Sequence, residues 1–243
     1  MPERWSYVVL GRGRWARRMR EVLESEGRRV ARIEQTRVGA DELTDELRRS
    51  AAQAAWLCVT PGPHVATMIR ASIAAGLHVV AEKPWLCSAA TTAGLEMEAR
   101  ERGLRVGVHF EYCLLEEVEA WRERFHDSQG LEFGGRFTTS RLDRQGIPAL
   151  ENFGSHLAAI RRHAAPKSQI AELACAYEAG DERRVWIGDE CIDFLRNREP
   201  LIQRFVERLE GGAEFPFGLD FGLRVTEDLT KWRDRQTAPS RRP

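Results

Sequence analysis

Lysine is nearly absent from this chain. Of its 37 Lys+Arg residues only Lys83, Lys167 and Lys231 are lysines, which leaves 34 arginines. Wherever the protein merely needs a positive charge, it therefore uses arginine. A lysine differs from arginine because desolvation can lower the pKa of its ammonium, whereas a guanidinium stays protonated. Lys83, which follows a predicted buried strand, is thus a candidate for a role that arginine cannot fill.

The chain also lacks an excess of charge of either sign. Its 37 basic and 37 acidic residues give a formal net charge of zero, so nothing general attracts it to nucleic acid or anionic membrane. No apolar run approaches the roughly 18 residues of a transmembrane helix, and the N-terminus leads directly into a predicted strand without a signal peptide. We expect a cytoplasmic protein with no nucleic-acid partner and no membrane partner.

Paired cysteines are missing as well. The five cysteines are odd in number and widely spaced, with no Cys-x-x-Cys pair, which disfavours a disulfide frame or a zinc site. No group of His, Cys and carboxylate residues has metal-ligand spacing, so we expect no catalytic metal. The 243 residues, of which 42% are hydrophobic, are typical of a globular protein with one large or two small domains.

Short apolar runs alternate with helical patterns through the first part of the chain. Strands are predicted at residues 7–10, 30–33, 55–59, 77–81 and 104–110. Such alternation indicates right-handed crossovers and a parallel sheet. Beyond it, strands are expected at 132–141, 168–177, 184–187 and 191–195, and two helices close the chain. The predicted fold is α/β, with a Rossmann domain over residues 1–112 and a small α+β domain over residues 113–243.

A glycine-rich turn connects the first predicted strand to its helix. Gly11-x-Gly13-x-x-Ala16 is weak evidence alone, because the same string also suits a tight turn, but its place between strand and helix is that of a dinucleotide fingerprint. Gly11 permits the turn, Gly13 lets a pyrophosphate approach, and Ala16 allows close packing. The backbone N–H groups of the helix start, near Arg14 and Trp15, would bind the phosphates.

The identity of the dinucleotide depends on Glu34. This acid lies about 20 residues beyond the glycine turn, at the end of the second predicted strand, where a carboxylate binds the ribose 2′-hydroxyl of NAD. Arg32 and Arg37 flank it, and either could bind the extra phosphate of NADP instead. NAD is favoured, and NADP is not excluded.

Three stretches together resemble the Gfo/Idh/MocA oxidoreductases. They are the glycine turn, the Val59-Thr60-Pro61-x-x-His64 loop, and the A-G-x-H-V-x-x-E-K-P string over residues 75–84. The resemblance covers residues 5–112 well and the rest weakly. It implies a nicotinamide cofactor held also by Thr60, Pro61, His64, Glu82 and Lys83. It further implies a small-molecule substrate and a homo-oligomer, dimer or tetramer, formed through the C-terminal domain, which is shorter here than is usual in the family.

By this resemblance Lys83 would project toward the nicotinamide and the substrate oxygen as a catalytic group. The alternative is an ordinary surface pair of Glu82 and Lys83. Trp85 replaces the small aliphatic residue that is usual after the family's proline, and it either packs or narrows the substrate side of the site.

The family motif around its second-domain histidine is only partly present. His156 has Asn152 four residues earlier and Ala159 three residues later, where the family often carries aspartates. An amide can orient an imidazole but cannot stabilise its charged form fully, which weakens a proton relay. His109, with Tyr112 near it on the substrate side, could instead donate a proton from the end of the fifth strand. The alternative for His109 is a structural histidine within the sheet.

These features together predict an NAD(P)-dependent oxidoreductase. It would transfer a hydride between the cofactor and a C–OH or C=O carbon of a sugar- or cyclitol-like compound, with Lys83, His156 and His109 as candidate catalytic residues. One alternative is an imine or ketone reductase of specialised-metabolite biosynthesis. Another is a nucleotide-binding protein without turnover.

Overall fold

The computed structural model describes residues 4–34, 39–140, 147–178, 180–195, 198–211 and 215–237. The chain forms two compact units. The first comprises Met1–His109 and Arg198–Leu223, and the second comprises Phe110–Asn197 and Arg224–Pro243. The chain therefore passes between the units three times, whereas the sequence predicted a single boundary after residue 112.

A five-stranded parallel sheet organises the first unit. Its strands lie in the order β2-β1-β3-β4-β5, with the bounds β1 Tyr7–Leu10, β2 Val30–Ile33, β3 Ala54–Leu57, β4 His78–Ala81 and β5 Val106–Val108. The strands β1 and β3 have no exposed residue, as expected of a sheet covered on both faces. The α/β class predicted from the alternating pattern is confirmed.

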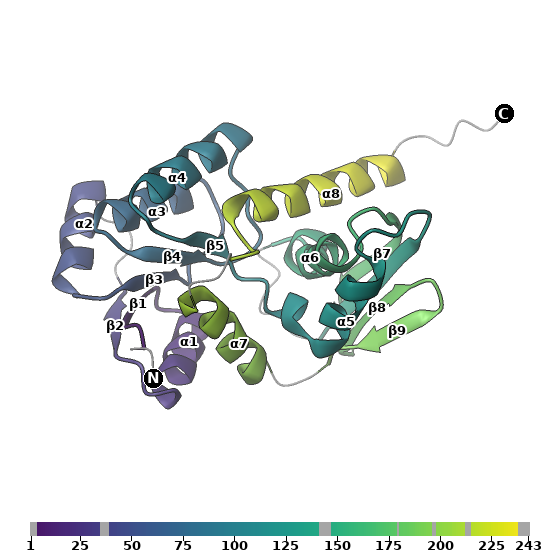
Figure 1. Ribbon diagram of the computed structural model, residues 1–243, viewed down its shortest axis with the longest axis horizontal. Coiled ribbons are helices and arrows are strands. Elements are labelled where there is room, and N and C mark those ends of the chain that lie inside the picture. Colours follow the sequence, from purple (N-terminus) through teal and green to yellow (C-terminus); the bar gives the residue numbers. More distant parts are fainter. Residues whose placement is uncertain are drawn as a thin grey trace. The chain divides into compact units, whose positions relative to one another are not determined.

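Helices cover both faces of this sheet. Figure 1 shows α2, α3 and α4 on one face and α1 and α7 on the other. Their bounds are α1 Arg14–Ser25, α2 Ala40–Arg49, α3 His64–Ala74, α4 Ala89–Glu101 and α7 Glu199–Glu210. Met19, Val22 and Leu23, spaced three and four residues apart or adjacent on α1, are buried. Apolar residues spaced three and four apart thus form the face that packs on the sheet.

The later segment of the chain protects the outer edge of β5. The amide of Val108 donates to the carbonyl of Phe217 at 2.8 Å, and Gly107 forms a bridge with Gly218. A Cβ atom on Gly107 would lie 2.2 Å from the ring of Phe215, so this approach requires glycine. β5 is shorter than the predicted strand at residues 104–110, because it pairs with the four-residue strand β4 over residues 106–108 only.

A buried charge cluster fixes the end of α7 in the first unit. Glu210 accepts hydrogen bonds from Arg28 Nε at 2.8 Å and Arg28 Nη2 at 3.0 Å, and from the hydroxyl of Tyr7 at 2.9 Å. The Arg28 side chain is 4% exposed and that of Glu210 is 14% exposed. Burial, together with the Glu210 charge, raises the pKa of Tyr7 well above its ordinary value. Tyr7 therefore stays a neutral donor.

Glu210→Ala is expected to destabilise the protein by about 3 kcal/mol, because removing one partner leaves a guanidinium buried without its carboxylate. Denaturant unfolding measures the loss. Glu207→Ala, an exposed change one turn earlier on α7, is the matched control and should cost less than about 0.5 kcal/mol. Equal stability of the two variants would contradict the role given to Glu210.

The second unit is built on a mixed four-stranded sheet in the order β7-β6-β8-β9. The strands are β6 Glu132–Thr139, β7 Gln169–Tyr177, β8 Glu182–Ile187 and β9 Glu190–Asp193. β6 pairs parallel with β7 and antiparallel with β8. The bounds agree with the prediction to within two residues, except that position 141 lies outside the described residues.

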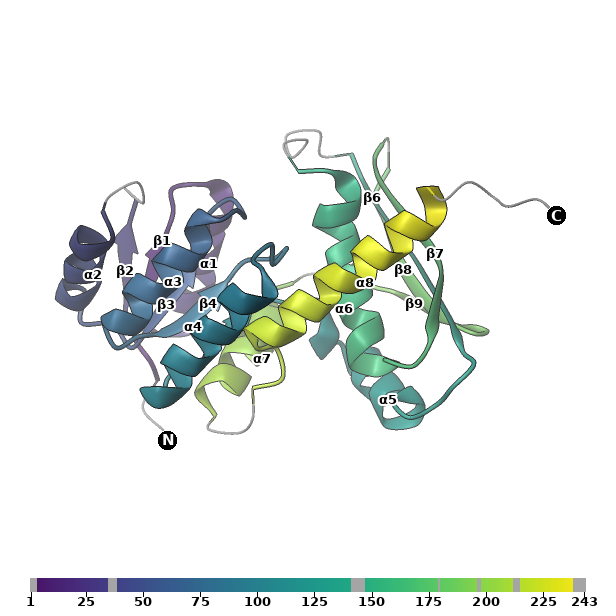
Figure 2. The same ribbon diagram turned by 90° about the horizontal axis from the view of Figure 1, so that it is seen from above.

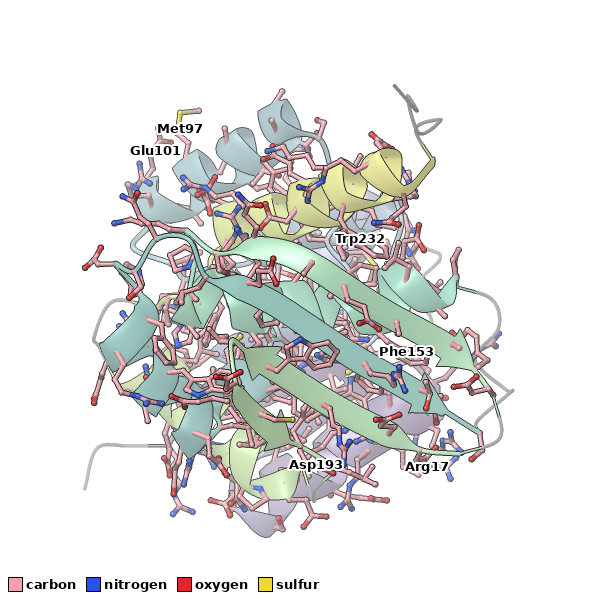
Figure 3. All side chains as sticks on the ribbon, turned by 90° about the vertical axis from the view of Figure 1, so that its right-hand side faces the viewer. Arg17, Met97, Glu101, Phe153, Asp193 and Trp232 are labelled. Carbon is pink, nitrogen blue, oxygen red and sulfur yellow. The ribbon has the colours of Figure 1, made fainter. Side chains whose placement is uncertain are left out.

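Helices pack on one face of this second sheet. They are α5 Glu116–Phe125, α6 Ser155–Ala164 and, in part, α8 Leu219–Thr237, with a short 3₁₀ helix η1 Glu111–Leu114 and a π-helical turn η3 Leu150–Gly154 (Figure 2). A Cβ atom on Gly135 would come 3.0 Å from Leu157, so glycine in β6 lets α6 lie close. Figure 3 looks onto the opposite face, which no described helix covers, with Asp193 on its edge strand β9.

Candidate functional site

The strand order of the first sheet reverses between β1 and β3. From these neighbours the chain proceeds toward β2 on one side and β4 on the other. In open parallel sheets such a switch point, at the carboxyl ends of the strands, is where ligands bind. Gly11 lies directly after β1 with φ +127°, and a Cβ atom there would be 2.4 Å from the carbonyl oxygen of Cys58 after β3. Only glycine fits this turn.

Gly13 is open where Gly11 is crowded. It caps the start of α1 in an extended conformation, and a Cβ atom on it would meet nothing within 4 Å. No side chain caps this helix start, and its first turn contains no acid. The backbone N–H groups therefore face space that a phosphate can enter, without a carboxylate to repel it. Ala16 is fully buried. The turn thus fits the pyrophosphate of a dinucleotide.

Glu34 lies one residue beyond β2, at the same edge of the sheet as the glycine turn. Its side chain is 44% exposed and forms an ion pair with Arg32. The two residues that favoured opposite cofactors in the sequence thus neutralise each other. Arg37, the other candidate for the extra phosphate of NADP, lies outside the described residues.

The loop after β3 also lies at this edge. Thr60 is exposed and Pro61 is half-buried, and His64 is the exposed first residue of α3. Cys58 begins the loop. Burial and the nearby Glu82 raise the pKa of its thiol well above the ordinary value, so the thiol stays protonated. The loop places polar groups beside the glycine turn without a reactive thiolate.

Glu82 points into the protein. Its carboxylate accepts a hydrogen bond from Trp56 Nε1 at 3.0 Å and contacts His109 Nδ1 at 3.2 Å. The side chain of Glu82 is only 10% exposed, so this residue is not half of an ordinary surface pair. The acid of the E-K-P string is instead held between β3 and the end of β5.

The environment of Glu82 keeps it ionised. Burial alone would raise the pKa of this carboxyl, but the His109 charge and hydrogen bonds from His109, Trp15 and Trp56 lower the pKa below its ordinary value. An ionised carboxylate can only accept, so Nδ1 of His109 carries the proton in their contact. Because the pair holds Glu82 in place, it also positions the start of the loop that carries Lys83.

His109 has no exposed surface and is enclosed by aromatic rings. Its ring centroid lies 4.7 Å from that of Phe205, 5.0 Å from Trp56 and 6.1 Å from Trp15. This surrounding suits a residue that positions Glu82. The proton-donor role of His109 stays a prediction.

Lys83 follows Glu82 and is half-buried, and its peptide bond to Pro84 is cis. The next residue, Trp85, is 2% exposed and donates from its indole to the hydroxyl of Thr92 at 2.9 Å. A Cβ atom on Gly222 would come within 3.0 Å of the Trp85 side chain. Trp85 therefore has the contacts of a packing residue.

The second unit supplies a carboxylate for His156 that the sequence did not reveal. Nδ1 of His156 lies 3.9 Å from Glu111 Oε2, and the two side chains are 3% and 2% exposed. Glu111 lies in η1, 45 residues before the histidine, so no local spacing could predict the pair. At 3.9 Å the two groups are near each other without a hydrogen bond between them, and they form an ion pair only when His156 is protonated.

Of the other predicted residues of this unit, Tyr112 packs against the same histidine and Asn152 binds Tyr177. The ring of Tyr112 lies 4.8 Å from that of His156, and its hydroxyl accepts a hydrogen bond from Arg183 Nη1 at 2.9 Å. Asn152 lies in η3, and its side-chain amide donates to the hydroxyl of Tyr177 at 3.0 Å. The structure therefore gathers Tyr112 and His156 with Glu111 and Arg183, neither of which the sequence singled out.

Over the described ranges, no three or more His, Cys, Asp or Glu side chains gather into a group that could hold a metal ion. None of the helices in the same ranges has both the length and the apolar content needed to cross a bilayer.

Solved structures of several dehydrogenases share this fold. The WlbA (WbpB) dehydrogenase from Thermus thermophilus, in complex with NAD and UDP-GlcNAcA, has a TM-score of 0.75 at 15% identity, covering 98% of this chain and 97% of that one. GenD2 from gentamicin A biosynthesis, in complex with NAD, has a TM-score of 0.73 at 18% identity, with 98% and 96% covered.

A third similar structure is the UDP-N-acetylglucosamine 3-dehydrogenase GnnA from Acidithiobacillus ferrooxidans. It has a TM-score of 0.75 at 14% identity, covering 96% of this chain and 97% of that one. No protein-family model matches the chain, and no curated protein matches it by sequence. Identities this low establish a common fold and nothing more.

Proposed function

We propose that this protein is a nicotinamide-dependent oxidoreductase, similar to the Gfo/Idh/MocA family, that acts on a sugar-like substrate. The observation that carries the proposal is the start of α1, where Gly13 opens an uncapped, acid-free helix terminus beside the β1/β3 switch point. A dinucleotide pyrophosphate is the ligand that such a terminus binds. The three similar structures are dehydrogenases, which supports the same reading.

Lys83 is the proposed group at the reacting carbon. The cofactor supplies the hydride chemistry, and the protein has to place the substrate and exchange a proton. Lys83 leaves the carboxyl edge of β4 on a backbone fixed by the buried Glu82–His109 pair. Its ammonium would hold the substrate oxygen and exchange that oxygen's proton.

Two contacts favour a sugar-like substrate over the alternatives. Trp85 was the residue that could have narrowed the substrate site. Because its indole is instead bonded to Thr92, it does not argue for a narrow, less polar site. The buried Glu111, 3.9 Å from His156, is a carboxylate that could take the place of the aspartates absent from positions 152 and 159, which favours an enzyme over a protein without turnover. His156 and Glu111 are a candidate acid–base pair of the second unit.

Binding and turnover test the proposal separately. Fluorescence titration with NADH and NADPH should show binding of NADH in preference to NADPH. Oxidation assays should then compare UDP-N-acetyl sugars, free hexoses and cyclitols, with reduction of cyclic imines as the counter-screen. Failure to bind either dinucleotide would remove the proposed function, and turnover of imines alone would replace the sugar-like substrate.

Glu34→Ala is expected to weaken NADH binding by about tenfold, since hydrogen bonds to a charged group contribute about 1.5–3 kcal/mol. NADPH binding should weaken less or improve, because Arg32 loses its ion-pair partner and can face the extra phosphate. Glu24→Ala, an exposed change near the far end of α1, is the control. Equal losses for NADH and NADPH would show that Glu34 does not contact the ribose.

A further inference from the structure

A second candidate binding site lies wholly within the second unit. Side chains from α6, from the start of β7 and from α8 line an open pocket of about 630 Å³. Its charged lining consists of Arg161, Lys167, Lys231, Arg235, Asp228 and Asp234. The pocket is within the roughly 300–1,000 Å³ range of small-molecule sites, and four basic groups face two acidic ones.

One of the two acids is already shared by two arginines. Asp228 Oδ2 accepts from Arg161 Nη1 and from Arg162 Nε, each at 2.9 Å, and its Oδ1 accepts from Arg162 Nη2 at 2.8 Å. The side chains of Arg161 and Asp228 are 11% and 10% exposed, and that of Arg162 is 20% exposed. One carboxylate thus serves two guanidinium groups away from solvent, which leaves an excess positive charge at the base of the pocket.

Arg161 also joins that base to the rim. It donates from Nε to the carbonyl of Ser168 and from Nη2 to the carbonyl of Pro166, each at 3.0 Å. These bonds hold the backbone on either side of Lys167. Burial lowers the pKa of Arg161, Asp228 opposes this, and the Arg162 and Arg235 charges lower the pKa further. The cations therefore repel one another across the pocket.

The rim contains two of the three lysines in the chain. Lys167 and Lys231 come from different elements, and the protein uses arginine at almost every other basic position. Lys167 pairs with Asp127 at 2.9 Å, but their side chains are 46% and 86% exposed, so this pair is easily exchanged. Lys231 and Arg235 are one turn apart on α8, which Trp232 marks in Figure 3. Compact ammonium groups beside guanidinium groups are well suited to phosphate oxygens.

The end of α8 and Asp234 both oppose an anion here. α8 ends at Thr237, and the C-terminal end of a helix carries roughly half a negative charge. Asp234 adds a full charge, but it is exposed and lies 3.7 Å from Arg233. Arg162 and the four basic lining residues, set against Asp228, Asp234 and Asp127, leave two positive charges, which outweigh the half charge of the helix end.

We propose that this pocket binds the phosphate groups of a small phosphorylated molecule. The proposal does not rest on the dehydrogenase function, because it uses no residue of the glycine turn or of the E-K-P string. The volume leaves room for an organic part beside the phosphate, and inorganic pyrophosphate is a suitable probe.

Calorimetric titration with pyrophosphate at constant ionic strength tests the pocket. The double variant Lys231→Gln/Arg235→Gln should bind pyrophosphate about tenfold or more weakly than the unaltered protein. Arg100→Gln/Arg102→Gln removes the same charge from exposed positions at the end of α4 and should change binding by less than about twofold. Absence of binding to the unaltered protein, or equal losses in both double variants, would overturn the proposal.

The scarcity of lysine allows a second measurement. Acetylation of the folded protein, read by mass spectrometry, reports separately on Lys83, Lys167 and Lys231. Pyrophosphate should slow modification of Lys167 and Lys231, also in the Gly13→Val protein, which lacks the proposed dinucleotide site. Protection confined to Lys83 would place the anion elsewhere and overturn the proposal, whereas loss of dinucleotide binding alone leaves this outcome unaffected.

Discussion

Lys83→Arg should lose about 100-fold or more in turnover on the true substrate, nearly as much as Lys83→Met, although it keeps the positive charge. The guanidinium is larger and planar, and it does not give up its proton, so it would displace the substrate oxygen instead of serving it. The half-buried position of Lys83, next to a Glu82 that is already engaged by Trp56 and His109, leaves a larger head group little freedom to move aside.

The measurement is steady-state turnover together with NADH affinity for both variants. The affinity should change little, because the phosphates are assigned to the glycine turn after β1 and not to the loop after β4. Near-normal turnover of Lys83→Arg would show that a positive charge is all this position needs, and the catalytic role would then be withdrawn.

Gly13→Val should weaken NADH binding by about 100-fold or more, since several hydrogen bonds to charged phosphates, each contributing about 1.5–3 kcal/mol, would be lost. The variant should nevertheless fold. Gly13 has φ −73° and ψ 172°, which valine adopts readily, and its Cβ position is open. The branched side chain would therefore fill only the space assigned to the pyrophosphate.

The chain offers a matched control for this change. Gly39 caps the start of α2 with φ −61° and ψ 155°, and a Cβ atom there also meets nothing within 4 Å. Gly39→Val should leave NADH affinity unchanged while costing similar stability. Gly11→Ala is unsuitable as a test because its Cβ atom would collide with Cys58, so lost binding could reflect a disturbed fold. Normal affinity in folded Gly13→Val would contradict the dinucleotide assignment.

The features that could be predicted from the sequence are those set by neighbours along the chain. Alternating apolar runs and helical patterns predicted the parallel sheet, and the glycine turn lies between β1 and α1 as expected. The partners of buried charges could not be predicted in this way. Glu82 meets His109, and His156 meets Glu111, across 27 and 45 residues of sequence. Such pairs depend on which strand ends and helices meet in the folded unit.

The membership of α7 in the first unit was missed for the same reason. The sequence predicted a helix here, but an apolar helix face does not reveal which sheet it covers. Phe205 packs on Trp56 and His109, and Glu210 binds Arg28. These contacts with side chains far earlier in the chain determine that α7 belongs to the first unit.

The return of α7 and Phe217 to the first unit also affects how the protein is made. A ribosome synthesises residues 110–197 after β5 and before α7 emerges, so the nascent first unit has Trp56, His109 and the edge of β5 uncovered during that time. The second unit has the same constraint, because residues 224–237 of α8 belong to it but follow α7 in the chain. A nascent chain arrested before Glu199 should therefore need a chaperone, and a shortened gene ending at residue 112 should yield aggregates instead of a working nucleotide-binding domain.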